Sequence, residues 1–436
     1  MLCRTSVVGV AAGMLAAAIV VGCSGDGDGQ RATARKAPAA NMPAASAKPA
    51  PPPREAPLTA GGPVGPAGAK LSLSKPQTKA MDAAHVAAAQ KLINGGLAYL
   101  LSRREADGGW SLGRGAMGPA VTAIVLKALL QHPDFDRNSP IVKKGFEVLL
   151  RYRNKDGSIY DVKQGQASYC TAIAIMAMAA AQDPRLTDTI RQASAYLVGL
   201  QIKPGQESPD GGKIGPDSPR IGGVGYGKSG EPNLSVLGMV VQAWHDGGMD
   251  VKDEAMQRAV GFLSRMQNRS ESNPLVWAKN GTNDGGFVYD LKNSKAGEGP
   301  GGMGLRSYGS MTYVGFKSML YAGVRRTDPR VQAAYRWIRR YWRLDSNPNM
   351  PRLRSKQGLF YYYHVFAKAL RTWGADEIAD LKKVKHNWRH ELIDVLAERV
   401  SPDGSWVNKA AHRWEEGNPV LCTSYAVLAL QEAMAK

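Results

Sequence analysis

Hydrophobic residues along the chain define two kinds of helical segment, which alternate from about residue 80 to the C-terminus. Segments of the first kind, such as 96–105 and 392–399, carry apolar residues at helical spacing with charges between them. Segments of the second kind are apolar nearly all round and rich in small residues; they span 121–130, 170–180, 234–244, 311–323, 362–370 and 422–431. A helix with one charged face lies at a surface, whereas a helix that is apolar on every side belongs inside. The pattern therefore predicts an outer and an inner set of helices.

A short turn of the form acidic–Gly–(Gly or Ser)–apolar joins an outer segment to the next inner one. It occurs at Ala106–Trp110, Lys155–Ile159, Asn283–Phe287 and Pro402–Trp406, with a looser version at Pro209–Lys213. Glycine allows the positive φ of a chain reversal, and aspartate can bond the neighbouring amides. The inner segments align without gaps on a hydroxyl near their start: Thr122, Thr171, Ser235, Thr312, Tyr363 and Thr423. Six such units predict six helical hairpins, the fifth with Gln357-Gly358-Leu359 in place of the Asp-Gly turn.

Six hairpins in a ring predict an all-α fold, a double-walled α/α toroid over residues 79–436. The sequence GFLSRMQN at 261–268, followed by DGGF at 284–287, resembles the QW repeat of terpenoid cyclases and protein prenyltransferase β-subunits. The resemblance covers about residues 80–434 and implies the same toroid. It does not by itself imply an activity, because one fold hosts unrelated functions.

The resemblance also implies where catalytic groups would stand. Cyclases of the squalene–hopene type protonate their substrate with Asp-x-Asp-Asp-Thr-Ala, whose Thr falls in the register of the aligned hydroxyls. No repeat of this chain has that acid cluster, the nearest match being Glu231-Pro232-Asn233. Prenyltransferases hold zinc with Asp, Cys and His in the same region; here Cys170, Cys422 and His364 lie there, without an Asp two residues before either Cys. We therefore expect no metal and no cofactor, and two buried cysteines.

The N-terminal end has the features of an export signal. Residues 1–22 combine Arg4, an apolar stretch and a small residue before Cys23. This order resembles the lipobox of bacterial lipoproteins, which implies cleavage before Cys23 and lipidation of its sulfur; an ordinary signal peptide is the alternative. Residues 23–78 are rich in Ala and Pro and predict a disordered linker. We expect a protein of the bacterial cell envelope, anchored by its lipid to the membrane at the periplasmic face or at the outer membrane.

The 436 residues carry a formal net charge of +19. The basic residues are spread along the chain, with one dense patch at 336–343. Two uses of this charge stay open, attraction to anionic lipid or envelope polymer and simple solvation of helix faces. Because the chain is predicted to be exported, we do not expect nucleic acid as a partner.

Two long glycine-rich loops, 204–232 and 280–310, lead from an outer to an inner segment, so both lie at the same mouth of the predicted ring. Binding and catalytic residues concentrate on such loops. With the inner segments nearby, they supply the candidate cavity or mouth residues Tyr226, Asp284, Tyr289, Asp290, Arg306, Tyr308, Tyr361, Tyr362, Tyr363, His364 and Glu416. Structural roles stay open beside the functional one: packing for the tyrosines and capping of the turn for Asp284.

Two functions of different class remain. In the first, the toroid of an envelope lipoprotein binds an apolar ligand such as an isoprenoid or a lipid in its central cavity. In the second, the protein is an enzyme. It would be a divergent terpenoid cyclase or prenyltransferase, or a glycan-active toroid that uses mouth carboxylates such as Asp284, Asp290 and Glu416.

Overall fold

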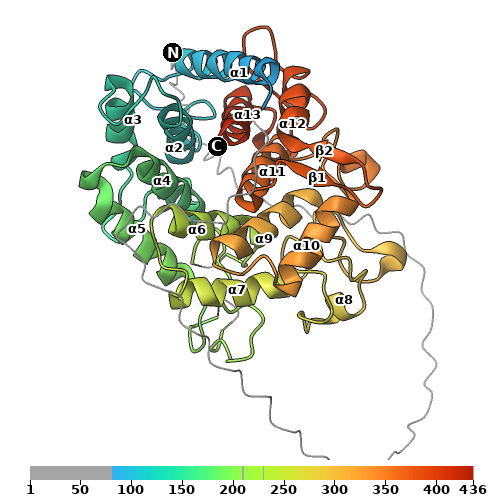
Figure 1. The fold of residues 1–436 in the computed structure, drawn as a ribbon. Coiled ribbons are helices and arrows are strands. Elements are labelled where there is room, and N and C mark those ends of the chain that lie inside the picture. The colour runs from blue at the N-terminus through green and yellow to red at the C-terminus, as the bar shows by residue number, and fades with distance from the viewer. Residues whose placement is uncertain (1–80, 209–210, 229, 436) are drawn as a thin grey trace, which may run out of the picture. The chain divides into compact units, whose positions relative to one another are not determined.

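The fold is an all-α toroid in which two concentric sets of helices surround a common axis (Figure 1). The computed structural model describes residues 81–435 apart from 209, 210 and 229, and these belong to one compact unit. The predicted signal peptide (1–22), the lipidated Cys23 and the linker (23–78) lie outside the described residues.

The inner wall consists of helices α2 (Gly118–Leu130), α4 (Ala167–Ala181), α6 (Leu234–Asp246), α9 (Gly309–Tyr321), α11 (Leu359–Trp373) and α13 (Pro419–Met434). Each packs against the next in this order, and α13 returns to α2, so the ring closes. Every residue from 118 to 129 in α2 and from 420 to 433 in α13 is buried. The prediction that helices apolar on all sides form the interior is therefore confirmed.

The outer wall consists of α1 (Ala83–Ser102), α3 (Pro140–Leu150), α5 (Thr187–Leu200), α7 (Glu254–Met266), α10 (Pro329–Arg340) and α12 (Trp388–Ala397). Helix α10 buries a single stripe made of Val331, Ala334, Trp337 and Ile338 and leaves its charged face outside. Helices α3, α5 and α10 pack chiefly on the inner helix that precedes them in the sequence. The closely packed pairs are therefore α2 with α3, α4 with α5, and α9 with α10. Helix α1 packs on α13 and α12, which joins the two ends of the ring.

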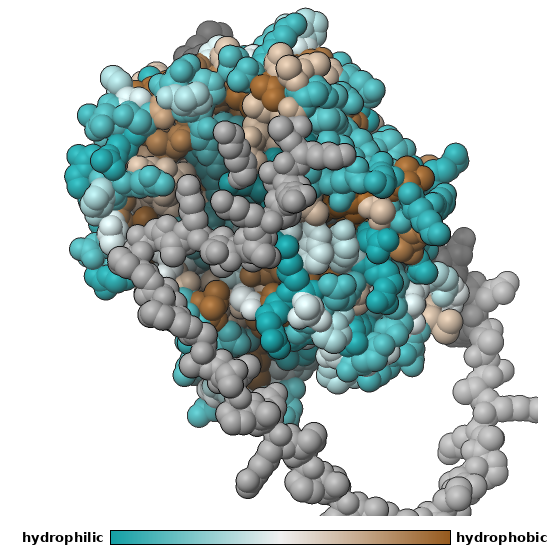
Figure 2. All heavy atoms as spheres, in the orientation of Figure 1, coloured by the Kyte–Doolittle hydropathy of each residue, from teal (hydrophilic) through white to brown (hydrophobic). Residues whose placement is uncertain are grey.

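Short helices and a pair of strands lie in the connections between the two walls. Helix α8 (Val276–Lys279) and the 3-10 turns η1 (Pro184–Leu186), η2 (Pro300–Gly302), η3 (Arg352–Arg354) and η4 (Arg413–Glu415) lie in the connections. An antiparallel pair, β1 (Glu377–Ala379) with β2 (Lys385–Asn387), joins α11 to α12 and places Ile378 opposite His386. Hydrophilic residues cover much of the face in Figure 2, with hydrophobic residues in scattered patches.

Each Asp-Gly turn is fastened to the inner helix that follows it. Asp284 Oδ1 accepts a hydrogen bond from Gly286 N at 3.0 Å, and Gly285 has a φ of 82°, as the turn chemistry predicts. The next amide, Phe287 N, donates to Thr312 Oγ1 at 3.1 Å. The same bond joins Trp110 N to Thr122, Ile159 N to Thr171 and Trp406 N to Thr423. The aligned hydroxyl is thus a structural fastening of the hairpin in four of the six repeats.

The looser turn expected at Pro209–Lys213 is a turn, because Gly211 N donates to the Ser208 carbonyl and Ser208 N donates to the Gly212 carbonyl, both at 2.9 Å, but this turn does not pack on the wall. A Cβ on Gly212 would meet nothing within 4 Å, and residues 209 and 210 lie outside the described part. The close packing on an outer helix is made instead by Gly222, whose φ is 84° and where a Cβ would strike the backbone of Arg258 on α7. Gly285 approaches the Ala333 carbonyl of α10 in the same way. The third repeat therefore meets the packing requirement with glycine but without aspartate.

Candidate functional site at the axis of the toroid

A cluster of charged side chains lies between the inner helices, and all of them except Arg371 are largely buried. We call it the basic cluster, and its members are Lys127, Asp246, Lys317, Lys368, Arg371 and Glu432. The three lysines share one register, because each stands five residues after an aligned hydroxyl of its helix. That repeated lysine on otherwise apolar helices is a signal in the sequence, but the sequence analysis did not single it out.

The basic cluster faces the axis rather than the space between the walls. Lys127 Nζ on α2 lies 3.0 Å from Asp246 Oδ2 on α6. Helix α4 separates these two helices in the ring, so the pair meets across the inner side of α4. Burial would raise the pKa of Asp246, but the charge of Lys127, the hydrogen bond with His245 and the charge of Lys368 hold it well below its usual range. Asp246 is therefore ionised.

A second carboxylate is shared by two cations. Glu432 Oε1 accepts from Lys368 Nζ at 2.7 Å, and Glu432 Oε2 accepts from Arg371 Nη1 at 2.7 Å. The Glu432 side chain is 2% exposed. Burial alone would raise the pKa of Glu432, but its two cationic partners lower it to about 2. Glu432 is thus an ionised carboxylate held in the interior by its pairs.

Lys317 is the member of the cluster that has no carboxylate of its own. Its Nζ donates to Gln242 Oε1 at 2.5 Å, and the residue is 2% exposed. Burial, followed by the nearby charge of Lys368, lowers the pKa of Lys317 to about 7. Among the described residues, the cluster therefore contains four basic groups and two carboxylates. Lys317 is the basic group that has no carboxylate partner.

Aromatic side chains lie next to the basic cluster. We call Tyr169, Tyr361, Tyr425 and His364 the tyrosine cluster. The hydroxyls of Tyr169 on α4 and Tyr425 on α13 are 3.3 Å apart, and α2 lies between these helices in the ring. The Tyr361 and Tyr425 rings have centroids 5.9 Å apart. Like the Lys127–Asp246 pair, these contacts cross the inner side of the wall.

His364 connects the two clusters. Its ring stacks on Tyr425 with centroids 5.6 Å apart. Burial, and then the charge of Lys317, lower the pKa of His364 to about 3, so the imidazole is neutral. Its Nδ1 is buried and makes no hydrogen bond within the described part of the chain. A buried polar atom of this kind calls for a partner.

Four of the expected candidates approach one another. The hydroxyls of Tyr226 and Tyr289, from the two long loops, lie close enough for each to influence the pKa of the other. Tyr308 is buried close to Tyr289 and Tyr361, and burial raises the pKa of all four tyrosines. The Lys295 ammonium lies 4.1 Å from the centroid of the Tyr289 ring. The loops thus add aromatic groups on the side where the inner helices begin.

The carboxylates of the mouth serve the chain's own structure. Asp284 Oδ2 accepts from Ser307 Oγ at 2.6 Å and from Trp337 Nε1 at 3.2 Å. Asp290 Oδ1 accepts from the backbone amides of residues 292 and 293. Arg306 Nε donates to the Glu298 carbonyl at 3.2 Å. The capping role left open for Asp284 matches these bonds.

Three further candidates stabilise helix α11 and its surroundings. Tyr362 and Tyr363 donate to the backbone carbonyls of Arg343 and Leu344, at 2.8 and 2.7 Å, so they point away from the axis. Glu416 is buried and accepts from the amides of residues 359 and 361 at 2.8 Å, which caps the start of α11. Burial raises the pKa of Glu416 to about 7 against the effect of these donors.

The two remaining cysteines are buried and free, as expected. Burial raises the pKa of the Cys170 thiol to about 12, and Cys422 Sγ donates to the Glu416 carbonyl at 3.1 Å. In the described part of the chain, these thiols and His364 do not come together as ligands of one metal ion.

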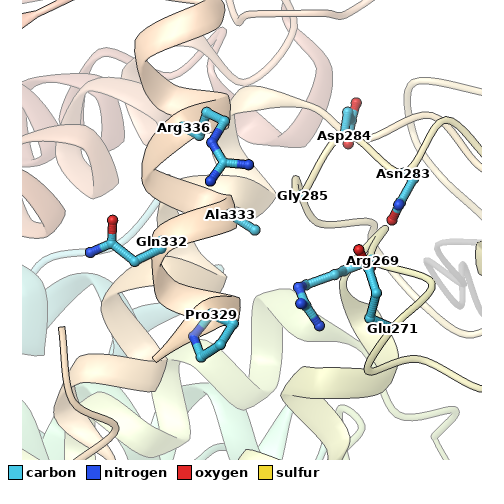
Figure 3. Close-up of a pocket in the computed structure, with 9 residues that line it drawn as sticks. All are labelled: Arg269, Glu271, Asn283, Asp284, Gly285, Pro329, Gln332, Ala333 and Arg336. Atoms are coloured by element: carbon cyan, nitrogen blue, oxygen red, sulfur yellow. The ribbon is translucent and has the colours of Figure 1, made fainter. Parts of the chain in front are cut away.

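A separate polar pocket of about 240 Å³ opens beside the outer helix α10. Figure 3 shows Arg336 and Gln332 from α10 on one side and Asn283 and Arg269 on the other. Gly285, which packs against α10, forms part of its lining. This pocket belongs to the outer wall, and it contains none of the buried groups of the axis.

Comparison with known proteins finds distant structural likeness only. The type II terpene cyclase MstE from Scytonema, without ligand, is 16% identical with a TM-score of 0.49, over 80% of this chain and 98% of that one. A protein from Actinoplanes is 15% identical (TM-score 0.46; 80% and 100% covered), and a wild-type glycosidase is 13% identical (TM-score 0.45; 81% and 99% covered). No protein-family model and no curated protein matches the sequence. The fold assignment rests on the helix packing of the chain itself.

Within the described residues, no helix combines the length and the apolar character that crossing a bilayer requires.

Proposed function

We propose that the toroid binds an anionic amphiphile, an isoprenoid or lipid with a carboxylate or phosphate group, at the inner side of its wall. The observation that carries this proposal is the buried ammonium group of Lys317, the cation of the basic cluster that has no carboxylate partner. Lys127, Lys368 and Arg371 have carboxylate partners, whereas the neighbours of the Lys317 ammonium are the Gln242 amide and the Tyr321 ring, neither of which carries a negative charge. A buried charge is costly unless it is paired, so the cluster favours a bound anion.

The tyrosine cluster suits the other part of such a ligand. Tyrosine and histidine rings offer apolar faces together with polar tips. Tyr425 contacts Tyr169 and Tyr361, and His364 places a buried, unpartnered Nδ1 between the aromatic and basic groups. An amphiphile would lie with its apolar chain toward the tyrosines and its anion toward Lys317. A ligand of this kind does not require the acid motif or zinc set of the enzymes that the QW repeat resembles.

We also propose that Cys23 carries the lipid that tethers this binding module to the envelope membrane. The lipobox-like residues before Cys23 and the linker composition of 23–78 support this. Incorporation of radiolabelled palmitate and membrane fractionation test it. Cys23→Ser should lose the label and leave the membrane fraction, and retention of both by this variant would contradict the anchor.

Binding is tested on the full-length chain, extracted in mild detergent, by titration with farnesyl phosphate and with farnesol. The two probes share an apolar chain and differ in the anion. Wild type should bind farnesyl phosphate more tightly than farnesol, and Lys317→Met should remove most of that difference. Lys143→Met is the matched control, because Lys143 is exposed on outer helix α3. Equal affinity of wild type for both probes would overturn the assignment of the anion site.

A further inference from the structure

A second group of polar side chains lies where the two ends of the ring meet. Helix α1, the first outer helix, packs on α12, the last one. Asp82 precedes α1 and caps it, since its Oδ1 accepts from His85 N at 2.9 Å. His85 and His390 stand on the facing sides of α1 and α12, and their rings stack with centroids 3.8 Å apart. Residues distant in sequence thus meet at this seam.

Three potential metal-ligand atoms converge there. Asp82 Oδ2 lies 2.7 Å from His85 Nδ1 and 3.7 Å from His390 Nε2. All three atoms lie within 4.8 Å of one another. His390 Nε2 is buried and makes no hydrogen bond within the described residues. Since Asp82 Oδ1 is occupied by the helix cap, Oδ2 is the oxygen that faces both imidazoles.

The opposite edge of His85 has the partner that metal-bound histidines usually have. Asp394 Oδ1, one turn along α12 from His390, lies 3.4 Å from His85 Nε2. A carboxylate on the second ring nitrogen fixes the tautomer, so that the first nitrogen keeps its lone pair for a metal. Nδ1 of His85 is hydrogen-bonded to Asp82 Oδ2 at 2.7 Å, so a metal ion would take the place of the proton that these two atoms share. The four residues therefore resemble a ligand set with its outer support, rather than a chance surface pair.

We propose that Asp82, His85 and His390 bind one divalent transition-metal ion, with zinc as the best fit, at the seam between α1 and α12. Two imidazoles and one carboxylate are borderline ligands that suit Zn²⁺ and its neighbours better than Mg²⁺ or Ca²⁺. Three protein ligands leave one tetrahedral position for water. Zn–N bonds of about 2 Å require the two rings to tilt away from their parallel stack, so that both lone pairs point to one centre.

Such an ion would join the beginning and the end of the ring. It stands apart from the basic and tyrosine clusters, and the proposal is independent of the amphiphile site. An ion bound only by the folded state stabilises that state, and the stabilisation grows with the logarithm of the ion concentration once this exceeds the Kd. The metal ion would therefore stabilise the contact between α1 and α12 that closes the toroid.

The test is calorimetric titration of ZnCl₂ into metal-free, full-length protein that carries no polyhistidine tag. We expect one ion per chain and a rise in Tm with zinc. His85→Gln and His390→Gln should each abolish both effects. Asp394→Asn should weaken binding by about 10- to 100-fold through loss of the outer support. His412→Gln, which changes an exposed histidine elsewhere, should bind as wild type does.

Co²⁺ provides a second readout that does not depend on stability. Four-coordinate Co²⁺ bound by these ligands should give visible absorption in wild type and in His412→Gln, and none in His390→Gln. Circular dichroism of each variant shows whether it is folded before titration. No zinc-dependent heat in wild type, or equal binding by wild type and the folded His390→Gln variant, would overturn the proposal.

Discussion

The Lys127 ammonium on α2 lies 3.0 Å from the Asp246 carboxylate on α6, and α4 stands between the two helices in the ring. The inner wall thus joins non-neighbouring helices through buried charge as well as through apolar contacts. Breaking such a pair leaves one charge unpaired in the interior, and this is costly. The basic cluster should therefore control both the stability of the toroid and the chemistry of its axis.

The first prediction concerns Lys317, whose pKa is lowered to about 7. The pKa of a lysine in an unfolded chain is about 10.4. Between about pH 7 and pH 10 the unfolded chain therefore binds more protons than the native one. The free energy of unfolding of wild type should therefore rise with pH in this window relative to that of Lys317→Met. Urea denaturation at a series of pH values measures the difference. Lys143→Met should follow wild type, and parallel curves for wild type and Lys317→Met would contradict the lowered pKa.

A second prediction concerns the carboxylate shared by Lys368 and Arg371. Glu432→Gln leaves both cations without their buried partner and should lower the free energy of unfolding by about 3–5 kcal/mol at neutral pH. The native pKa of Glu432 is lowered to about 2, so its stabilisation is present above the unfolded value of about 4.3 and is lost as pH falls toward 2. Acid denaturation curves of wild type and variant should converge in that range.

Glu147 provides the comparison for this experiment. It pairs with Lys144 on the surface, where its side chain is 65% exposed. Glu147→Gln should cost less than about 1 kcal/mol, because exposed ion pairs contribute little. Similar losses in the two variants would mean that burial does not set the strength of the Glu432 pairs.

The hydroxyl that fastens each turn leads to a third prediction. Thr312 Oγ1 accepts from Phe287 N, and Thr312→Val leaves this buried amide without an acceptor while nearly keeping the side-chain shape. The free energy of unfolding should fall by about 1–3 kcal/mol. Thermal or urea denaturation measures it, with Thr187→Val on the exposed start of α5 as the control. An unchanged stability would show that the hydroxyl is not a structural fastening.

Glycine at the turn gives a fourth prediction. Gly285 has positive φ, and a Cβ there would lie 2.6 Å from the Ala333 carbonyl oxygen of α10. Gly165 also has positive φ, but a Cβ there would meet nothing within 4 Å. Gly165→Ala should cost about 1 kcal/mol from backbone strain alone, and Gly285→Ala should cost more because α10 must also move. Comparable Tm values for the two variants would exclude the steric contribution.

The fold could be predicted from the sequence because it depends on patterns that each repeat carries locally. The apolar run around Thr122 and the charged face of α10 are visible without knowing their neighbours. In the third repeat the Asp-Gly sequence forms its turn away from the wall, whereas the packing contact at Gly222 requires only glycine and has no aspartate to mark it in the sequence. In the other repeats that have the Asp-Gly turn, the turn sequence and the packing glycine are in the same place, but in the third repeat they are separate.

The candidate site could be predicted only in part. Tyr226, Tyr289, Tyr308 and Tyr361 lie near one another, and whether they bind a ligand stays a prediction. The basic cluster could not be predicted, since its charges come from five inner helices and their pairing depends on the order of those helices in the ring. His85 and His390 meet for the same reason, because only closure of the ring brings α1 to α12.

The fastening between turn and inner helix has a consequence for how this chain can diverge. The same amide-to-threonine bond spans 12 residues from Trp110 to Thr122, 17 from Trp406 to Thr423, and 25 from Phe287 to Thr312. Both ends of each loop are therefore held whatever its length. The helix packing of the wall does not depend on the residues inserted between these ends. Loop insertions cost little entropy as they lengthen. The mouth of the toroid can thus acquire new segments, and with them new specificities, while the ring beneath keeps its geometry.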